Sequence, residues 1–173
     1  MTMQYEFTLI VDRDASDEPY ADTLFELGEG DYAPEGGPEG NFVHAFQEAD
    51  SLTGAIVAAI HLVEKTDVQV MGVQSEDLVT LKDIADRTGR SHESVRLLAA
   101  GKRGPGGFPA ASSVGSQGFY SWTQVSQWFA DHYNAEAGSE FDREIAAADH
   151  LVRARRLLAG DAHRAEMAQL VDA

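Results

Sequence analysis

Two short amphipathic segments follow one another between residues 80 and 101, and each begins at a hydroxyl residue and stops at a glycine. The first starts at Thr80 and ends at Gly89, and the second runs from Ser91 to Gly101. Hydroxyl side chains are good helix N-caps, and glycine readily adopts the left-handed backbone that ends a helix. The spacing therefore predicts two helices joined by a sharp turn, a helix-turn-helix.

Apolar residues recur at helical spacing within both segments, so each helix should have one buried side. The small residue Ala85 lets the two helices cross closely, and Val95 and Leu98 fill the joint between them. Helical geometry then turns the opposite side of the second segment outward. That outward side carries His92, Glu93, Arg96 and Ala100.

The outward side chains are of the kinds that read base edges in the major groove of DNA. Arg96 can donate two hydrogen bonds to a guanine, and Glu93 can accept one from a cytosine. His92 lies near the helix start, where base contacts concentrate, and Ser91 or Ser94 can bind a phosphate. The pattern predicts double-stranded DNA as the partner, with residues 91–100 as the recognition helix. An ordinary helical hairpin, which can match by chance, is the alternative.

The residues after the second segment predict a wing. Lys102 and Arg103 begin a basic, glycine-rich connection that ends at residue 107. Residues 108–109 start an extended segment, and residues 119–121 are expected to return as its partner strand. Ser121 and Gln124 then match a capping box at the start of a helix. Along that helix the side chains at core spacing are Trp122, Val125, Trp128 and Phe129.

Residues 78–129 together resemble the winged helix-turn-helix modules of the MerR and excisionase type. The likeness is carried by LVTLKDIADRTGRSHESVRLLAAG, by the Phe-Pro pair that follows, and by FYSWTQVSQWF. It covers about 50 of the 173 residues, and the RGPGG insert departs from it. The resemblance implies a sequence-specific DNA-binding protein of the transcriptional-regulator class. It implies DNA contacts from Arg90, His92, Glu93, Arg96, Lys102 and Arg103.

Charge is distributed unevenly along the chain, whose formal net charge is −16. Residues 1–79 contain 17 acidic and 2 basic residues, and residues 130–173 contain 9 and 5. Residues 80–129 contain 3 acidic and 6 basic residues, so they form the only net-positive segment of the three. This segment coincides with the helix-turn-helix pattern, which favours DNA binding there. The acidic remainder should repel DNA.

The first 76 residues are predicted to alternate between strands and helices. Residues 4–11 and 41–48 are strand-like, with residues 31–35 as hairpin partner of the latter, and residues 68–73 form a last strand. Pro19 suits the start of a short helix, and Ser51 caps a longer one. The order is βαββαβ, the ferredoxin-like arrangement, with an antiparallel sheet and two helices on one face. The short helix should have an apolar face of Tyr20, Leu24, Phe25 and Leu27.

Residues 135–173 are rich in alanine and are predicted to be helical, with Asp161 capping a last short helix. One apolar face follows the four-three spacing that seats one helix against another. We expect this face to join two chains into a homodimer, because a single module covers only one DNA half-site. Packing of the face against the chain's own N-terminal unit is the alternative. The face comprises Phe141, Ile145, Ala148 and Val152, extended by Leu151, Leu157 and Leu158.

Few residues suggest catalysis or cofactor binding. The chain has no cysteine, which excludes disulfides and thiolate metal sites, and its six histidines show no His-x3-His spacing. The acidic residues 12–18 lack the glycine and glutamate of a calcium loop. Residues 101–104 do not match a phosphate loop, and residues 115–118 do not match a nucleophile elbow. We therefore expect no enzyme activity, no cofactor and no metal.

The predicted organisation is α+β in three parts. An acidic ferredoxin-like domain spans residues 1–76, a winged helix-turn-helix spans residues 77–134, and a C-terminal helical segment spans residues 135–173. The start MTMQYEFTLIV lacks the features of a signal peptide, and the longest apolar stretch, residues 54–60, is too short to span a bilayer. We expect a cytoplasmic protein with no membrane partner.

A protein-binding adaptor is the alternative function. Its acidic N-terminal domain would neutralise a basic protein partner, as an antitoxin does, or mimic DNA. The chain could have this role whether or not its second domain also binds DNA.

Overall fold

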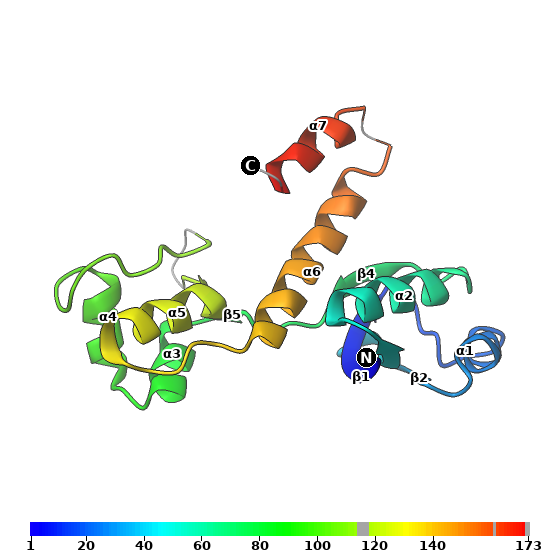
Figure 1. Ribbon diagram of the computed structural model, residues 1–173, viewed down its shortest axis with the longest axis horizontal. Helices are drawn as coiled ribbons and strands as arrows, with labels where there is room; N and C mark the ends of the chain where they lie inside the picture. Colours follow the sequence, from blue (N-terminus) through cyan, green and yellow to red (C-terminus); the bar gives the residue numbers. More distant parts are fainter. Residues whose placement is uncertain (114–117, 161, 172–173) are drawn as a thin grey trace. The chain divides into compact units, whose positions relative to one another are not determined.

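The computed structural model describes residues 1–113, 118–160 and 162–171, which form a mixed α+β structure (Figure 1). These residues contain seven α-helices, a four-stranded antiparallel sheet and a two-stranded sheet. Contacts divide the chain into unit 1, residues 1–74 and 147–173, and unit 2, Ser75–Ala146. Among the described residues, no helix has the length and apolar character needed to span a membrane. The expected cap Asp161 lies outside them.

Unit 1 is built around the four-stranded sheet. Its elements are β1 (Met3–Val11), α1 (Tyr20–Gly28), β2 (Tyr32–Gly37), β3 (Gly40–Ala49), α2 (Leu52–Glu64) and β4 (Val70–Val73). The strand order is β2-β3-β1-β4, and all neighbours are antiparallel. The predicted βαββαβ order is therefore confirmed. The predicted hairpin also forms, with Tyr32 of β2 opposite Ala45 of β3.

One side of the central strands is buried, and α2 packs against β1 and β3. In β1 the buried positions are Phe7, Leu9 and Val11, which alternate with less buried residues as a one-sided strand requires. Helix α2 begins at its predicted cap Ser51, whose Oγ accepts the N–H of Gly54 at 3.1 Å. The buried residues of α2 are Leu52, Ala55, Ile56, Ala59, Ile60 and Val63.

Helix α1 buries less than its sequence predicts. Leu24 is fully buried, but Phe25 and Leu27 are 65% and 44% exposed. Gly28 lies so close to the Tyr32 ring that a Cβ there would be 2.4 Å from a ring carbon. The helix therefore contacts the unit along Leu24 and Gly28, one turn apart, and leaves Phe25 and Leu27 on either side of the contact. The predicted apolar face is therefore buried only in part.

Strand β4 lies at one edge of the sheet, and two of its backbone N–H groups donate to helix side chains. Asp149 Oδ1 of α6 (Glu140–Leu157) accepts from Val73 at 3.0 Å, and Glu64 Oε1 of α2 accepts from Val70 at 3.4 Å. Each carboxylate also binds an arginine of α6, Arg153 at 2.8 Å and Arg155 at 2.5 Å. Unpaired edge groups can template pairing with another chain. These side chains therefore protect the edge.

The apolar face predicted along α6 is partly used within the chain. Ile145 and Val152 are only 6% and 7% exposed, whereas Phe141 is 40% exposed. Ile145 and Val152 therefore pack within the chain. Helix α7 (Arg164–Ala168) and the 3₁₀ turn η1 (Gln169–Val171) follow, and neither contains a buried residue.

Unit 2 is organised around a single apolar core. It contains β5 (Leu78–Val79), α3 (Leu81–Thr88), α4 (His92–Ala99), β6 (Tyr120–Ser121), α5 (Trp122–Tyr133) and the first turns of α6. β5 and β6 form an antiparallel pair. The core residues come from β5 and from helices α3, α4 and α5, which confirms the predicted core role of the α5 aromatics. They are Val79, Ile84, Ala85, Val95, Leu98, Val125, Trp128 and Phe129.

Replacing Asp149 by alanine should destabilise unit 1, because the buried Val73 would keep an N–H group without its carboxylate acceptor. The expected loss is about 1–3 kcal/mol in the free energy of unfolding, measured by urea denaturation. Asp149→Asn keeps an acceptor oxygen and should lose less. Glu140→Ala serves as the control on the same helix. Equal stability of Asp149→Ala and the unmodified chain would show that this carboxylate does not hold β4.

Candidate nucleic-acid interface

Helix α3 is held by hydrogen bonds at both ends. Thr80, the predicted N-cap, forms a capping box in which Asp83 N–H donates to Thr80 Oγ1 at 3.2 Å and Thr80 N–H donates to Asp83 Oδ2 at 2.8 Å. Donation from the Thr80 backbone lowers the pKa of Asp83. The carboxylate half of the cap is therefore formed at neutral pH, and its contribution to stability is lost as the pH falls through that lowered pKa. At the other end, Gly89 has a φ of 64° and makes the predicted sharp turn.

Helix α4 begins directly after this turn at its predicted cap. Ser91 Oγ accepts the N–H of Ser94 at 3.2 Å, so the hydroxyl already serves the helix start. The helix ends with Gly101 at a φ of 64°, and the N–H of Lys102 donates back to Leu97 O at 2.9 Å. This left-handed ending fixes the point at which the basic loop leaves the helix.

The inward and outward sides of α4 are those that the sequence predicts. Val95 and Leu98 are 0% and 2% exposed, and both belong to the core of unit 2. His92, Glu93 and Arg96 are exposed. Because the apolar side is fixed by packing, the polar side is held toward solvent.

Glu93 and Arg96 form an ion pair on this outer side. Arg96 Nε donates to Glu93 Oε2, and Arg96 Nη2 donates to Glu93 Oε1, both at 2.7 Å. These hydrogen bonds lower the pKa of Glu93 and raise the pKa of Arg96. Both groups therefore stay charged at neutral pH. One donor edge of Arg96 is occupied before any ligand arrives, and the pair adds no net charge to the face.

Arg90 contacts aromatic rings of unit 2, whereas the resemblance implied that it contacts DNA. Its guanidinium carbon lies 4.4 Å from the ring centre of Tyr133 and 5.2 Å from that of Phe129. Arg87 lies similarly over Trp122 at 5.0 Å. Such cation–π contacts stabilise by about 0.5–1 kcal/mol at exposed sites. Arg90 and Arg87 therefore fasten the turn and α3 to helix α5.

The glycine-rich loop after α4 is anchored to the core. Trp128 Nε1 donates to Gly106 O at 3.0 Å, and the rings of Phe108 and Trp128 pack edge to face with centres 4.9 Å apart. Lys102 and Arg103 are exposed on this loop. The RGPGG insert thus has a defined path. The positive φ angles along it belong to Gly101, Gly104, Gly106 and Gly107.

The predicted pair of wing strands is wrong. Residues 108–109 are not in a strand, and Tyr120–Ser121 pairs with Leu78–Val79. One backbone bond, from Ser112 N–H to Phe119 O at 2.7 Å, joins the two sides of the loop. The rings of Phe108 and Tyr120 lie 5.9 Å apart, so residue 108 packs into the core and does not pair along residues 119–121. Residues 115–117, part of the rejected nucleophile-elbow match, lie outside the described residues.

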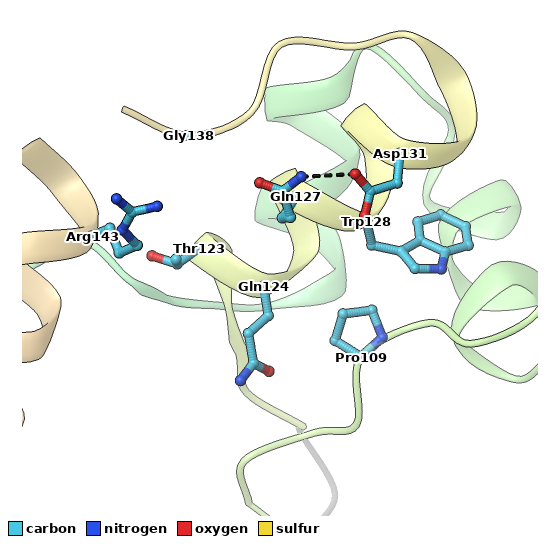
Figure 2. A pocket seen from close by; sticks show the side chains of 8 residues that line it. All are labelled: Pro109, Thr123, Gln124, Gln127, Trp128, Asp131, Gly138 and Arg143. Carbon is cyan, nitrogen blue, oxygen red and sulfur yellow. Dashed lines mark hydrogen bonds between the residues drawn. The ribbon is translucent and has the colours of Figure 1, made fainter. Parts of the chain in front are cut away.

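A pocket of about 410 Å³ lies along α5 (Figure 2). Gln127 Nε2 donates to Asp131 Oδ1 at 2.8 Å along its rim, and Arg143 faces Thr123 across it. This surface was not predicted from the sequence, although polar residues three and four apart on α5 are a detectable signal for an exposed helical stripe. Its lining residues are Pro109, Thr123, Gln124, Gln127, Trp128, Asp131, Gly138 and Arg143.

Comparisons with known proteins identify no relative: no family model matches the chain, and no match was found among curated proteins or solved structures. Among the described residues, no group of three or more histidine, aspartate or glutamate side chains is placed to hold a metal ion. The function must be inferred from the chain's own residues.

Replacing Gly104 by alanine should destabilise unit 2 and displace the basic loop. The residue has a φ of 82°, and a Cβ there would be 2.6 Å from Leu98 Cδ2 and 2.8 Å from Tyr133 Oη. The left-handed backbone alone should cost about 1–2 kcal/mol in the free energy of unfolding. Gly37→Ala is the matched control, since nothing lies within 4 Å of a Cβ there. Similar effects of both substitutions in thermal unfolding would contradict this account of the loop.

Proposed function

We propose that the chain binds double-stranded DNA through α4 and the basic loop that follows it, as a winged helix-turn-helix regulator. The observation that carries the proposal is the two-sidedness of α4. Its apolar side is sealed by the core, and its exposed side carries His92, Glu93 and Arg96. The major groove of DNA admits one helix presented in this way.

The predicted site residues take different roles in this proposal. Arg96 reads a guanine edge, with His92 and Glu93 beside it. Lys102 and Arg103 bind phosphates, which fixes register without reading sequence. The remaining residues support the helix, namely Ser91 as the N-cap, Ser94 as the donor to that cap, and Arg90 against Tyr133 and Phe129.

The charge distribution fits a regulator that contacts DNA at few points better than it fits a protein that coats nucleic acid. Residues 80–129 carry a surplus of three positive charges, while the whole chain carries −16. Attraction to DNA therefore depends on groups close to the phosphates, within a Debye length of about 10 Å. Beyond that range the acidic segments act against association.

A protein-binding adaptor is the second candidate, and the acidic first segment favours it. Residues 1–79 contain 17 acidic residues and only two basic ones, Arg13 and Lys65. Arg13 is already paired with Asp12 at 2.8 Å, which leaves the other carboxylates largely uncompensated. A surface of this sign attracts basic partners and speeds their encounter.

Selection of bound fragments from a random duplex pool by the full-length chain tests the DNA-binding proposal. Enrichment of a common sequence, with retention of that duplex in a direct binding assay, is the expected result. A chain that retains no duplex at low ionic strength would contradict the proposal and leave the adaptor role.

Replacing Arg96 by alanine and replacing Lys102 by alanine should have different effects on DNA binding. Arg96→Ala should cost about 1–3 kcal/mol at the preferred duplex and relax the preference at one base pair. Lys102→Ala should weaken all duplexes similarly and reduce the salt dependence by about one unit of slope. Affinity and base preference are measured by titration of labelled duplexes. If Arg96→Ala leaves the base preference unchanged, α4 does not lie in the major groove.

Replacing Glu93 by glutamine should strengthen binding to random duplex, because it removes a negative charge from the outer side of α4 and releases Arg96. The salt dependence should steepen by about one unit of slope. Glu140→Gln is the matched control, because Glu140 pairs with Arg143 at the same i,i+3 spacing on α6. If both variants strengthen binding equally, overall charge and not the α4 face is responsible.

A further inference from the structure

The four-stranded sheet of unit 1 packs against helices on one of its two sides. Val43 and Ala45 of β3 are fully buried there, beneath α2. Helix α6 reaches the sheet at its β4 edge, through Asp149. Side chains alternate along a strand, so the other residues of β3 point to the opposite side of the sheet. This opposite side is here called the open face, and its central residues are Glu6, Thr8, Glu35, Phe42, His44 and Phe46.

Each phenylalanine of the open face lies directly opposite a glutamate on a neighbouring strand. Phe42 is paired with Glu35 of β2, and Phe46 is paired with Glu6 of β1. Both phenylalanines are partly exposed, and both glutamates are exposed. Opposite residues of antiparallel strands have Cβ atoms about 5 Å apart. The face therefore presents an aromatic ring beside a carboxylate twice, at positions about 13 Å apart along β3.

His44 lies between the two phenylalanines and is held from two neighbouring strands. Its Nδ1 lies 3.0 Å from Thr8 Oγ1, and its Nε2 lies 2.8 Å from Glu35 Oε2. The side chains of His44 and Glu35 are nevertheless 39% and 67% exposed. These contacts show that β1, β2 and β3 all contribute side chains to the same face, and they fix its polar centre.

The carboxylates of the open face have little compensation. Glu6 is exposed, as is Glu48, which lies two residues beyond Phe46 on β3. Neither carboxylate has a hydrogen-bond or ion-pair partner among the described residues. Arg153 lies beside Gly72 of β4, but it is paired with Asp149 at 2.8 Å. The row of rings is thus bordered by uncompensated negative charge.

We propose that the open face binds a basic segment of another protein, whose arginine or lysine side chains lie over Phe42 and Phe46 and pair with the neighbouring glutamates. An aromatic ring attracts a cation to its face, and a carboxylate beside the ring adds a charged hydrogen bond. Unit 1 contains one example of this arrangement within the chain. The guanidinium carbon of Arg13 lies 5.8 Å from the ring centre of Tyr20, and its Nη2 lies 2.8 Å from Asp12 Oδ2.

The charge of the face favours this partner over the other classes that an aromatic sheet surface can bind. Single-stranded nucleic acid also stacks on aromatic rings, but its phosphates would lie among Glu6, Glu35 and Glu48. A second copy of the chain would bring like carboxylates together. A basic segment is attracted by all of them. The inference rests on the adaptor candidate, for which it names a surface and a partner chemistry, and it is independent of DNA binding by α4.

Titration of fluorescently labelled octaarginine with the full-length chain, followed by anisotropy at low ionic strength, tests the rings. A double variant with Phe42→Leu and Phe46→Leu keeps apolar side chains and the charge of the chain but removes both rings. It should bind octaarginine about tenfold more weakly. Phe25→Leu is the matched control, because Phe25 is 65% exposed on α1, and it should leave the affinity unchanged.

Glutamate substitutions test the same face without altering its rings, and they decide the matter if the double variant disturbs the circular dichroism spectrum. Glu6→Gln should weaken octaarginine binding about threefold. Glu26→Gln removes the same charge from α1, on the helix side of the sheet, and should have a clearly smaller effect.

Two results would overturn the surface while leaving the adaptor role to another part of unit 1. One is equal binding of octaarginine by the unmodified chain and a folded double variant, and the other is equal weakening by Glu6→Gln and Glu26→Gln. Tighter binding of single-stranded oligothymidylate than of octaarginine, or a dimer of the chain that the double variant abolishes, would assign the face to a different occupant. A chain that binds no octaarginine at low ionic strength would contradict both the surface and the adaptor role.

Discussion

The packing of Val95 and Leu98 with Ile84, Ala85 and the apolar side of α5 is the constraint on which unit 2 depends. It fixes the rotation of α4 about its own axis. Arg96 directly follows Val95, so a rotation of about 100° would bring its guanidinium into the core. Burial of an unpaired charge is far more costly than a surface ion pair is favourable. The outward position of Arg96 and Glu93 is therefore a consequence of apolar packing and not of their own pairing.

Helix α5 also holds the basic loop and the turn before α4 in place. Trp128 lies in the core and also donates to Gly106 O, and Tyr133 packs against the core while its ring lies under Arg90. The basic loop and the turn before α4 are thus tied to one helix. A change that moves α5 will be transmitted to both, whereas a change on the outer side of α4 leaves the framework intact. Framework and surface can therefore be tested by separate substitutions.

The features that the sequence predicted well are those decided within a few residues. Thr80 and Ser91 cap their helices because each hydroxyl lies three residues before a backbone N–H that has no partner within the helix. Gly89 makes the turn because the backbone conformation of a glycine depends on that residue alone. The βαββαβ order likewise follows from periodicity in each segment. The partner of Tyr120–Ser121 is β5, more than forty residues away in the chain, and the contact of Arg90 with Tyr133 also spans about forty residues. No local pattern specifies such contacts.

Helix α6 shows why periodicity alone could not select its buried face. Phe141, Ile145, Ala148 and Val152 have the same four-three-four spacing as Ala147, Leu151, Ala154 and Leu158, so both rows are candidates by that criterion. Polar residues between them decide the outcome. Asp149 is one turn from Val152 and finds the N–H of Val73, and Arg155 finds Glu64. A carboxylate that satisfies an edge strand orients the helix more strictly than apolar area does, because hydrogen bonds are directional and hydrophobic contacts are not.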